Sequence, residues 1–230
     1  MAIKKAKKVA VILNGCGHRD GTEIHEAVLT LLAIEEAGAT WEALALDSDQ
    51  ARVLNHVSGS VDTAASPRNM LQESARIARG RIRNISDVNP ANYCAVIIPG
   101  GNGTASNLCN FATAGKGMTV SAPVESFLKA FHVLKRPIGA VCIAPVILAK
   151  IFGEKGLKLT LGDAHGEAAQ VAAMMGSRPE DCAAIDCVVD EKLRMVTTPA
   201  YMLEASIADI AKGIRSLVNQ VLRMAPDQAM

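Results

Sequence analysis

Cys142 is the residue of this sequence best placed to act as a nucleophile. A β-rich run, residues 137–141, leads into it, and an apolar helix-like segment, residues 143–151, follows at once. A strand that turns this sharply into a helix strains its corner residue and tolerates only small neighbours two positions away, as Ala140 and Ala144 are. At a helix N-terminus the dipole lowers the pKa of a thiol and favours the thiolate. The pattern predicts a reactive cysteine; an ordinary buried cysteine at a strand end is the alternative.

Glu26 is a second candidate, in the first helix that the sequence predicts. Residues 9–13 are typical of a buried parallel strand, residues 15–21 of a glycine-rich loop, and residues 22–37 of a helix. In an open parallel sheet, binding groups gather outside the carboxyl ends of the strands. Glu26 is therefore expected near the thiol, where it could take and return a proton. A residue that only complements the helix dipole is the alternative.

Backbone amides form a third group of candidates. A β-branched strand is predicted over residues 95–98, and residues 99–103 follow it with three glycines. Glycine lets the backbone approach a ligand closely and direct N–H groups at it. Gly100 and Gly101, together with Ile143 directly after the cysteine, are expected to bind an oxyanion or the substrate. A plain tight turn is the alternative, and neither a P-loop lysine nor a G-x-G-x-x-G frame is present.

A histidine that could act as the base of a cysteine–histidine pair is harder to assign. His165 follows a strand predicted over residues 157–161, near the place where such a base could lie. Each of the five histidines is interpreted as a surface or loop residue: His18, His25, His56, His132 and His165.

The order of elements positions these candidates. Strands and helices alternate along the chain, which favours a mainly parallel sheet with helices on both faces, an α/β sandwich. A length of 230 residues favours one domain over residues 1–230. Further predicted strands are 43–46, 138–141, 185–189 and 195–198, and further helices are 69–78, 121–134, 164–175 and 200–224.

Residues 47–93 form a long excursion with one predicted helix. Such a stretch in a compact domain is usually functional or interfacial, so it is a candidate for contacting a partner or covering the site. A solvated loop with a helix cap is the alternative.

Composition excludes several classes of function. A net charge of +1 and 3% aromatic residues do not indicate a nucleic-acid surface. No apolar run approaches the roughly 18 residues of a membrane span. The run after the basic start (Lys4, Lys5, Lys7, Lys8) is too short for a signal peptide. The six cysteines show neither a C-x-x-C pair nor zinc-type spacing, so reduced thiols, a cytoplasmic location, no metal and no cofactor are expected.

Several stretches resemble the enhancing-lycopene-biosynthesis (ElbB-type) proteins of the PfpI-like, class I glutamine amidotransferase-like superfamily, over nearly the whole chain. They are Gly15-Cys16-Gly17, Asp20-Gly21 with Glu23 to Leu32, Asn55-His56, Arg68-Asn69, Ala75 to Gly80, Pro99-Gly100-Gly101, Asn107 to Ala112, Cys142-Ile143-Ala144-Pro145 and Thr197 to Met202.

The resemblance implies a flavodoxin-like three-layer sandwich, with Cys142 at a nucleophile elbow, Glu26 beside the sulfur and an oxyanion pocket at Gly101 and Ile143. It also implies a homodimer and a cofactor-free, glutathione-independent glyoxalase that converts glyoxal, a small aldehyde, to the 2-hydroxy acid. By older naming it implies a link to isoprenoid biosynthesis.

Two departures from the superfamily pattern bear on activity. Its histidine should fall near Leu161-Gly162, where this sequence has none, and Pro199-Ala200-Tyr201 stands where amidotransferases have His-x-Glu. Ammonia transfer from glutamine is therefore not expected. The alternatives to an aldehyde-converting enzyme are a redox-sensing or interaction protein with an oxidisable Cys142 and a degenerate amidotransferase-like subunit fed by a partner.

Overall fold

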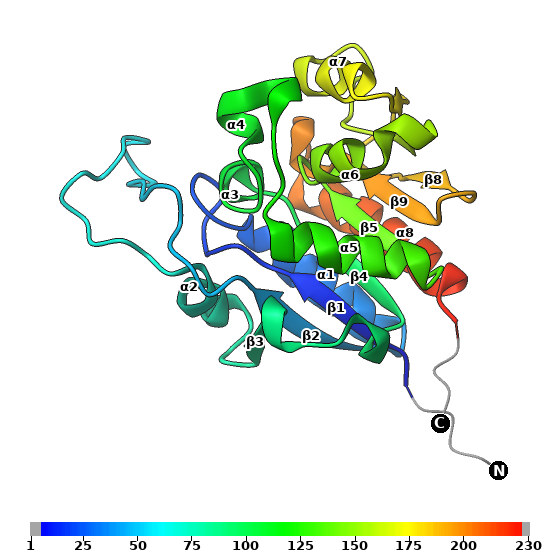
Figure 1. Ribbon diagram of the computed structural model, residues 1–230, viewed down its shortest axis with the longest axis horizontal. Helices are drawn as coiled ribbons and strands as arrows, with labels where there is room; N and C mark the ends of the chain where they lie inside the picture. Colours follow the sequence, from blue (N-terminus) through cyan, green and yellow to red (C-terminus); the bar gives the residue numbers. More distant parts are fainter. Residues whose placement is uncertain (1–5, 227–230) are drawn as a thin grey trace.

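A seven-stranded sheet forms the centre of the computed structural model, which describes residues 6–226 (Figure 1). Neighbouring strands are parallel except for the hairpin of β8 and β9. In spatial order the strands are β3 (Ile82–Asn84), β2 (Thr40–Ala45), β1 (Lys8–Ile12), β4 (Ala95–Ile98), β5 (Ile138–Val141), β9 (Met195–Thr198) and β8 (Val188–Asp190). The predicted α/β fold with a mainly parallel sheet is confirmed.

Successive strand residues point to opposite faces of the sheet, and each face has its own core. Ile12 and Ile98 pack on the side of helices α5 (Ala122–Val133) and α6 (Pro145–Phe152). Val11 and Ile97 pack on the side of helices α1 (Ile24–Glu36) and α8 (Ile207–Met224). Helix α5 crosses in front of the sheet in Figure 1 and α1 lies behind it, which gives the predicted three layers.

The predicted final helix begins later than expected. Residues 200–202 form a 3-10 turn instead of its first turn, and α8 begins after Ser206, whose hydroxyl accepts a hydrogen bond from the Asp209 N–H. An N-cap serine of this kind satisfies a backbone donor that the helix itself leaves free. Because the helix begins later, residues 200–202 are not part of it and lie at the candidate site.

Several shorter elements also differ from expectation. The strand predicted over residues 157–161 is only β6 (Lys158–Leu159), which pairs with β7 (Arg178–Pro179) in a separate two-stranded sheet. The sequence did not predict β3 or the short helices α3 (Asn102–Ser106) and α4 (Phe111–Ala114). Helix α7 (Glu167–Met174) is shorter than predicted.

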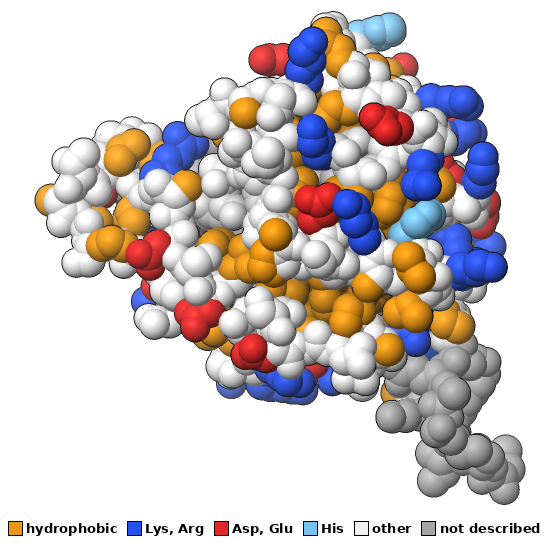
Figure 2. Space-filling model, in the orientation of Figure 1, with side chains coloured by type: hydrophobic (Ala, Val, Ile, Leu, Met, Phe, Trp, Pro, Cys, Tyr) orange, Lys and Arg blue, Asp and Glu red, His pale blue; other side chains and the backbone are white. Residues whose placement is uncertain are grey.

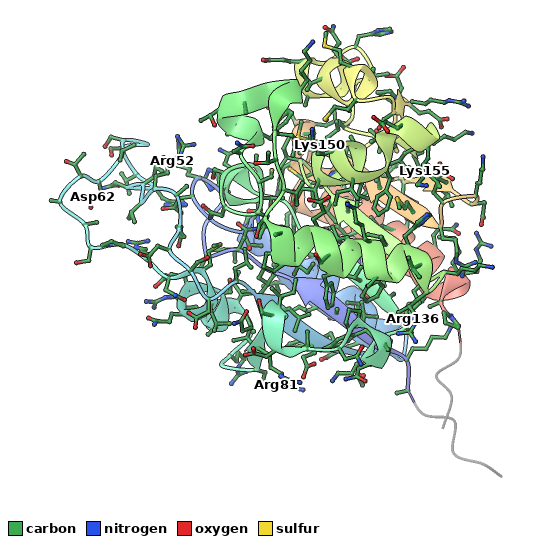
Figure 3. All side chains as sticks on the ribbon, in the orientation of Figure 1. Arg52, Asp62, Arg81, Arg136, Lys150 and Lys155 are labelled. Atoms are coloured by element: carbon green, nitrogen blue, oxygen red, sulfur yellow. The ribbon has the colours of Figure 1, made fainter. Side chains whose placement is uncertain are left out.

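Within residues 47–93, the predicted helix is α2 (Met70–Ile77), which Asn69 caps. Residues 51–68 extend away from the sheet as a loop, drawn in cyan, from which Arg52 and Asp62 project (Figures 1 and 3). The loop is attached near the candidate site, because the Leu54 N–H donates to Asp20 at 2.7 Å. Its role in contacting a partner stays a prediction.

The surface over α5 is mixed in character. Figure 2 shows acidic, basic and hydrophobic side chains interspersed on this face. No helix within residues 6–226 is long and apolar enough to cross a membrane. Lys4 and Lys5 of the basic start lie outside the described residues. The expectation of one domain over residues 1–230 stays a prediction.

Candidate active site

Cys142 occupies a sharp turn between β5 and α6. Its φ is 60°, a left-handed conformation that costs a non-glycine residue on the order of 1–2 kcal/mol. The Cys142 N–H donates to the Thr198 carbonyl on β9 at 2.9 Å, and the Ala144 N–H donates to the Val141 carbonyl at 3.0 Å. These bonds hold the strained corner, which has the geometry that the small-x-Cys-x-small pattern predicts.

Glu26 is fully buried in the first turn of α1 and lies against Cys142. The Gly100 N–H donates to Glu26 Oε2 at 2.9 Å, and the Tyr201 N–H is 3.4 Å from Oε1. The same carboxyl lies beside the Cys142 side chain, since a Cβ on Gly100 would be 2.7 Å from Glu26 Oε2 and 2.5 Å from the Cys142 Cβ. Helix α1 is anchored here because the Glu23 carboxylate accepts the Glu26 N–H at 2.6 Å. The structure therefore brings the two predicted catalytic side chains together.

Two of the three predicted amides point at the sulfur. The Gly101 and Ile143 N–H groups lie beside Cys142 Sγ and act to lower the pKa of its thiol. Gly101 has φ 98°, and a Cβ there would lie 2.5 Å from the Glu23 nitrogen, so only glycine fits. The Gly100 N–H is taken by Glu26, so Gly100 positions the carboxyl instead of offering a donor to an oxyanion. A Cβ on Gly100 would lie 2.5 Å from the Cys142 Cβ.

The electrostatics contradict the expected resting thiolate. Burial, and secondly the charge of Glu23, raise the pKa of Glu26 to about 8. Burial, and secondly Glu26, raise the pKa of the Cys142 thiol well above its ordinary value, and the two N–H donors oppose this only in part. The dipole argument was wrong because α6 begins only at Pro145, which has no N–H, while the sulfur is desolvated.

The pair therefore behaves as one acid-base unit. Two buried acidic groups in contact cannot both be ionised, so near neutral pH the unit keeps its protons. A carboxyl whose pKa is about 8 is well matched to exchanging protons near neutral pH.

The Cys142 side chain opens into a pocket of about 550 Å³. Apolar Ile143 and Met202 line it, as do polar side chains from the 15–21 loop, from the starts of α1 and α3, and from the turn after β9. These polar residues are His18, Glu23, His25, Asn102 and Tyr201. The reactive-cysteine interpretation is favoured over a sealed core cysteine, because this thiol reaches a cavity large enough for a ligand.

Sequence reasoning missed one wall of this pocket. His25 Nδ1 lies 2.9 Å from the Tyr201 hydroxyl and 4.0 Å from Glu23 Oε1. Two features of the sequence could have indicated these residues: His25 directly precedes Glu26, and Tyr201 belongs to the Thr197 to Met202 stretch that carries the family resemblance. His165, the one histidine weighed as a base, is exposed and does not line the pocket. No cluster of three or more His, Cys, Asp or Glu side chains within residues 6–226 is arranged to hold a metal ion.

Known proteins resemble this chain over most of its length. The rat protein named ES1 protein homolog, mitochondrial, is 41% identical over 225 residues, which are 94% of this chain and 84% of the rat protein. The human protein named glutamine amidotransferase-like class 1 domain-containing protein 3, mitochondrial, is 40% identical over 229 residues, which cover 96% and 84%.

Solved structures share the fold. An isoprenoid biosynthesis protein with an amidotransferase-like domain from Ehrlichia chaffeensis superposes with a TM-score of 0.88 at 31% identity, over 95% of this chain and 99% of that one. Glyoxalase III from Candida albicans superposes with a TM-score of 0.61 at 15% identity, over 96% and 98%, a likeness of fold alone.

The relatives correct one expectation. A cytoplasmic location was expected from free cysteines, but the names of the rat and human relatives place those proteins in mitochondria. The cytoplasmic prediction was wrong, because reduced thiols indicate a reducing compartment but do not identify which compartment it is. The same relatives support the wider superfamily and not specifically its ElbB-type members.

A family model also matches most of the chain. The DJ-1/PfpI family model matches residues 7–207, which include every residue of the pocket and of the Cys142–Glu26 pair. The chain belongs to the DJ-1/PfpI family.

Proposed function

We propose that this protein is a cofactor-free, glutathione-independent glyoxalase-type enzyme, which converts glyoxal to glycolate with Cys142 as nucleophile and Glu26 as proton shuttle. One observation carries the proposal. A cysteine with strained backbone contacts a protonatable carboxyl, receives N–H groups from Gly101 and Ile143, and opens into a pocket.

The reaction needs no oxidant or reductant. As sulfur attacks one aldehyde carbon, its proton passes through Glu26 to the carbonyl oxygen, and a hemithioacetal forms. Glu26, ionised again once it has passed that proton on, removes the proton on that carbon and delivers it to the second carbonyl oxygen, which gives an enediol. Protonation of the second carbon, with loss of the hydroxyl proton from the first, yields a thioester, and water cleaves its C–S bond, releasing glycolate and the free thiol. The Gly101 and Ile143 amides are the donors proposed for the developing oxyanion.

The similarity to an isoprenoid biosynthesis protein supports a finer proposal, that this chain is an ElbB-type member with a related role. The fold shared with glyoxalase III does not by itself carry the activity, which depends here on the pair and its amides. A homodimer is also proposed, with residues 51–68 as a candidate contact region, and sedimentation of the purified protein tests it.

Steady-state kinetics of glycolate formation test the proposal. We expect wild-type protein to form glycolate at least about 100-fold faster than an equal concentration of free cysteine does, because positioning and acid-base catalysis each contribute about that much or more to the rate. Cys142→Ser and Glu26→Gln should abolish the excess while the far-UV circular dichroism is retained. His165→Gln, an exposed change away from the pocket, should leave the rate unaltered. Undiminished turnover by Cys142→Ser would refute the mechanism.

A redox-sensing role is the second candidate, and one arrangement favours it. The Gly101 and Ile143 N–H groups and a protonated Glu26 surround the sulfur with donors, which would stabilise the oxygens of a sulfinate. Mild peroxide that oxidises Cys142 selectively, in protein with no aldehyde turnover, would favour this role.

A further inference from the structure

The pocket is far larger than the proposed reaction requires. Its volume of about 550 Å³ lies in the range of sites that enclose drug-sized ligands, on the order of 300–1,000 Å³. Glyoxal has two carbon atoms and would occupy only the end where Cys142, Gly101 and Ile143 meet. The remaining space lies beside polar side chains that the mechanism does not use.

The unused polar groups include a hydrogen-bonded pair that forms one wall of the pocket. The Tyr201 hydroxyl and His25 Nδ1 lie 2.9 Å apart, and both residues line the pocket. Burial, and then the charges of Glu23 and Glu26, raise the pKa of Tyr201, so its hydroxyl stays protonated and can donate. The Tyr201 backbone N–H lies 3.4 Å from Glu26 Oε1, so this wall is fixed relative to the reacting groups.

The charge of the pocket selects against anions. Glu23 is the acidic lining residue beside this wall; its side chain is 13% exposed, and its Oε1 lies 4.0 Å from His25 Nδ1. None of the residues that line the pocket is a lysine or arginine. Burial, and then His56, lower the pKa of His18, so this ring does not supply a cation at neutral pH. A phosphorylated or carboxylated ligand would meet the Glu23 carboxylate, with no lysine or arginine of the lining to offset it.

From this wall we infer the substrate class: a 2-oxoaldehyde with an uncharged, hydroxylated carbon chain beyond its reacting carbonyls, whose hydroxyl groups bind Tyr201 and His25 while Glu23 excludes anionic analogues. The inference rests on the proposed glyoxalase chemistry at Cys142. It makes Tyr201, His25 and Glu23 specificity residues, since a site built to hydrogen-bond a hydroxyl rejects analogues that lack one.

A matched series of substrates tests the inference. Methylglyoxal, hydroxypyruvaldehyde and hydroxypyruvaldehyde phosphate share three carbons and differ in one hydroxyl and then in charge, and 3-deoxyglucosone adds a longer hydroxylated chain. We expect kcat/KM to be at least about tenfold higher for the two neutral hydroxylated compounds than for methylglyoxal. The phosphate should be the poorest substrate of the four.

Three variants assign the preference to the wall. Tyr201→Phe should lower the ratio of kcat/KM for hydroxypyruvaldehyde over methylglyoxal by about tenfold, mainly through KM, because only the hydroxyl is lost. Glu23→Gln, which keeps an oxygen to cap α1, should raise the relative rate on the phosphate. His25→Gln should lower the hydroxypyruvaldehyde ratio as Tyr201→Phe does, and His165→Gln, its matched control, should not alter either ratio.

Binding to Cys142→Ser protein separates this inference from the proposed catalysis. Calorimetry should show that 3-deoxyglucosone binds this variant at least about tenfold more tightly than methylglyoxal, and that adding Tyr201→Phe removes the difference. If this binding preference is found without wild-type turnover, the substrate-tail inference stands and the catalytic proposal fails. If wild-type protein turns over all neutral substrates without preference, catalysis stands and this inference is overturned.

Discussion

Replacing Glu26 with glutamine should make the stability of this protein less dependent on pH. Glu26 is fully buried, and its pKa is raised from 4.5 to about 8, chiefly by burial. Between these values the folded protein holds a proton that the unfolded chain releases, so the free energy of unfolding falls as pH rises. This stability is fully present below pH 4.5 and is lost as pH rises to about 8.

The size of the effect follows from the two pKa values. At about 1.36 kcal/mol per pH unit, the wild-type protein should lose about 3.5 kcal/mol of this contribution between pH 5 and pH 8. Glutamine does not titrate, and its amide can still accept the Gly100 N–H and donate to the Cys142 sulfur. The free energy of unfolding of Glu26→Gln relative to wild type should therefore rise by about 3.5 kcal/mol over this interval.

Urea unfolding at pH 5 and pH 8 measures the difference. With an m-value of about 3 kcal/mol/M, the urea midpoint of Glu26→Gln relative to that of wild type should rise by about 1 M from pH 5 to pH 8. Glu154→Gln, which alters an exposed carboxyl, is the control and should show no such change. A constant gap between Glu26→Gln and wild type would show that Glu26 is already ionised at neutral pH, which refutes the protonated pair.

Three other outcomes are expected. Because Glu26 must be ionised to accept a proton, kcat/KM for glyoxal should rise about tenfold per pH unit up to about pH 8 and then level off. Values of kcat/KM that stay constant from pH 6 to pH 9 would contradict this. In D2O, NMR should find deuterium on the carbinol carbon of glycolate, since the enediol is reprotonated by an exchangeable group, and glycolate without deuterium would indicate a direct hydride shift. Gly101→Ala should reduce the free energy of unfolding more than Gly80→Ala does. Both glycines have a positive φ, 98° and 79°, but only a Cβ on Gly101 would meet backbone atoms, at 2.5 Å. Gly80→Ala should cost about 1 kcal/mol, and equal costs of the two changes in urea unfolding would refute the steric argument.

The central sheet could be predicted because its signal is local. Strands 95–98 and 138–141 have the bounds that the sequence predicts, since each is a short apolar run with a proline at one end, Pro99 after the first and Pro137 before the second. The turn at Cys142 was equally local, because the small residues that such a bend requires stand two positions away on either side. Parallel strands then bring their carboxyl ends to one rim, which is why Cys142 and Glu26 meet.

The rest depended on contacts between distant parts of the chain. Tyr201 was assigned to the final predicted helix, yet its N–H lies against Glu26, 175 positions earlier in the chain. The thiol pKa was misjudged for a related reason: helix position is visible in sequence, whereas desolvation by tertiary packing is not. The His25–Tyr201 pair joins α1 to the turn after β9, a contact that no local pattern indicates.

Rapid-quench mass spectrometry of protein mixed with glyoxal tests the role of Cys142 most directly. Wild-type protein should carry one glyoxal-derived adduct on the peptide that contains Cys142, and it should form and decay at the rate of glycolate release. Glu26→Gln should form the same adduct more slowly, because addition loses its proton relay, and should then accumulate it, because the proton transfer between carbons is blocked. Glycolate formation with Cys142 unmodified, or with the adduct on another cysteine, would contradict the account.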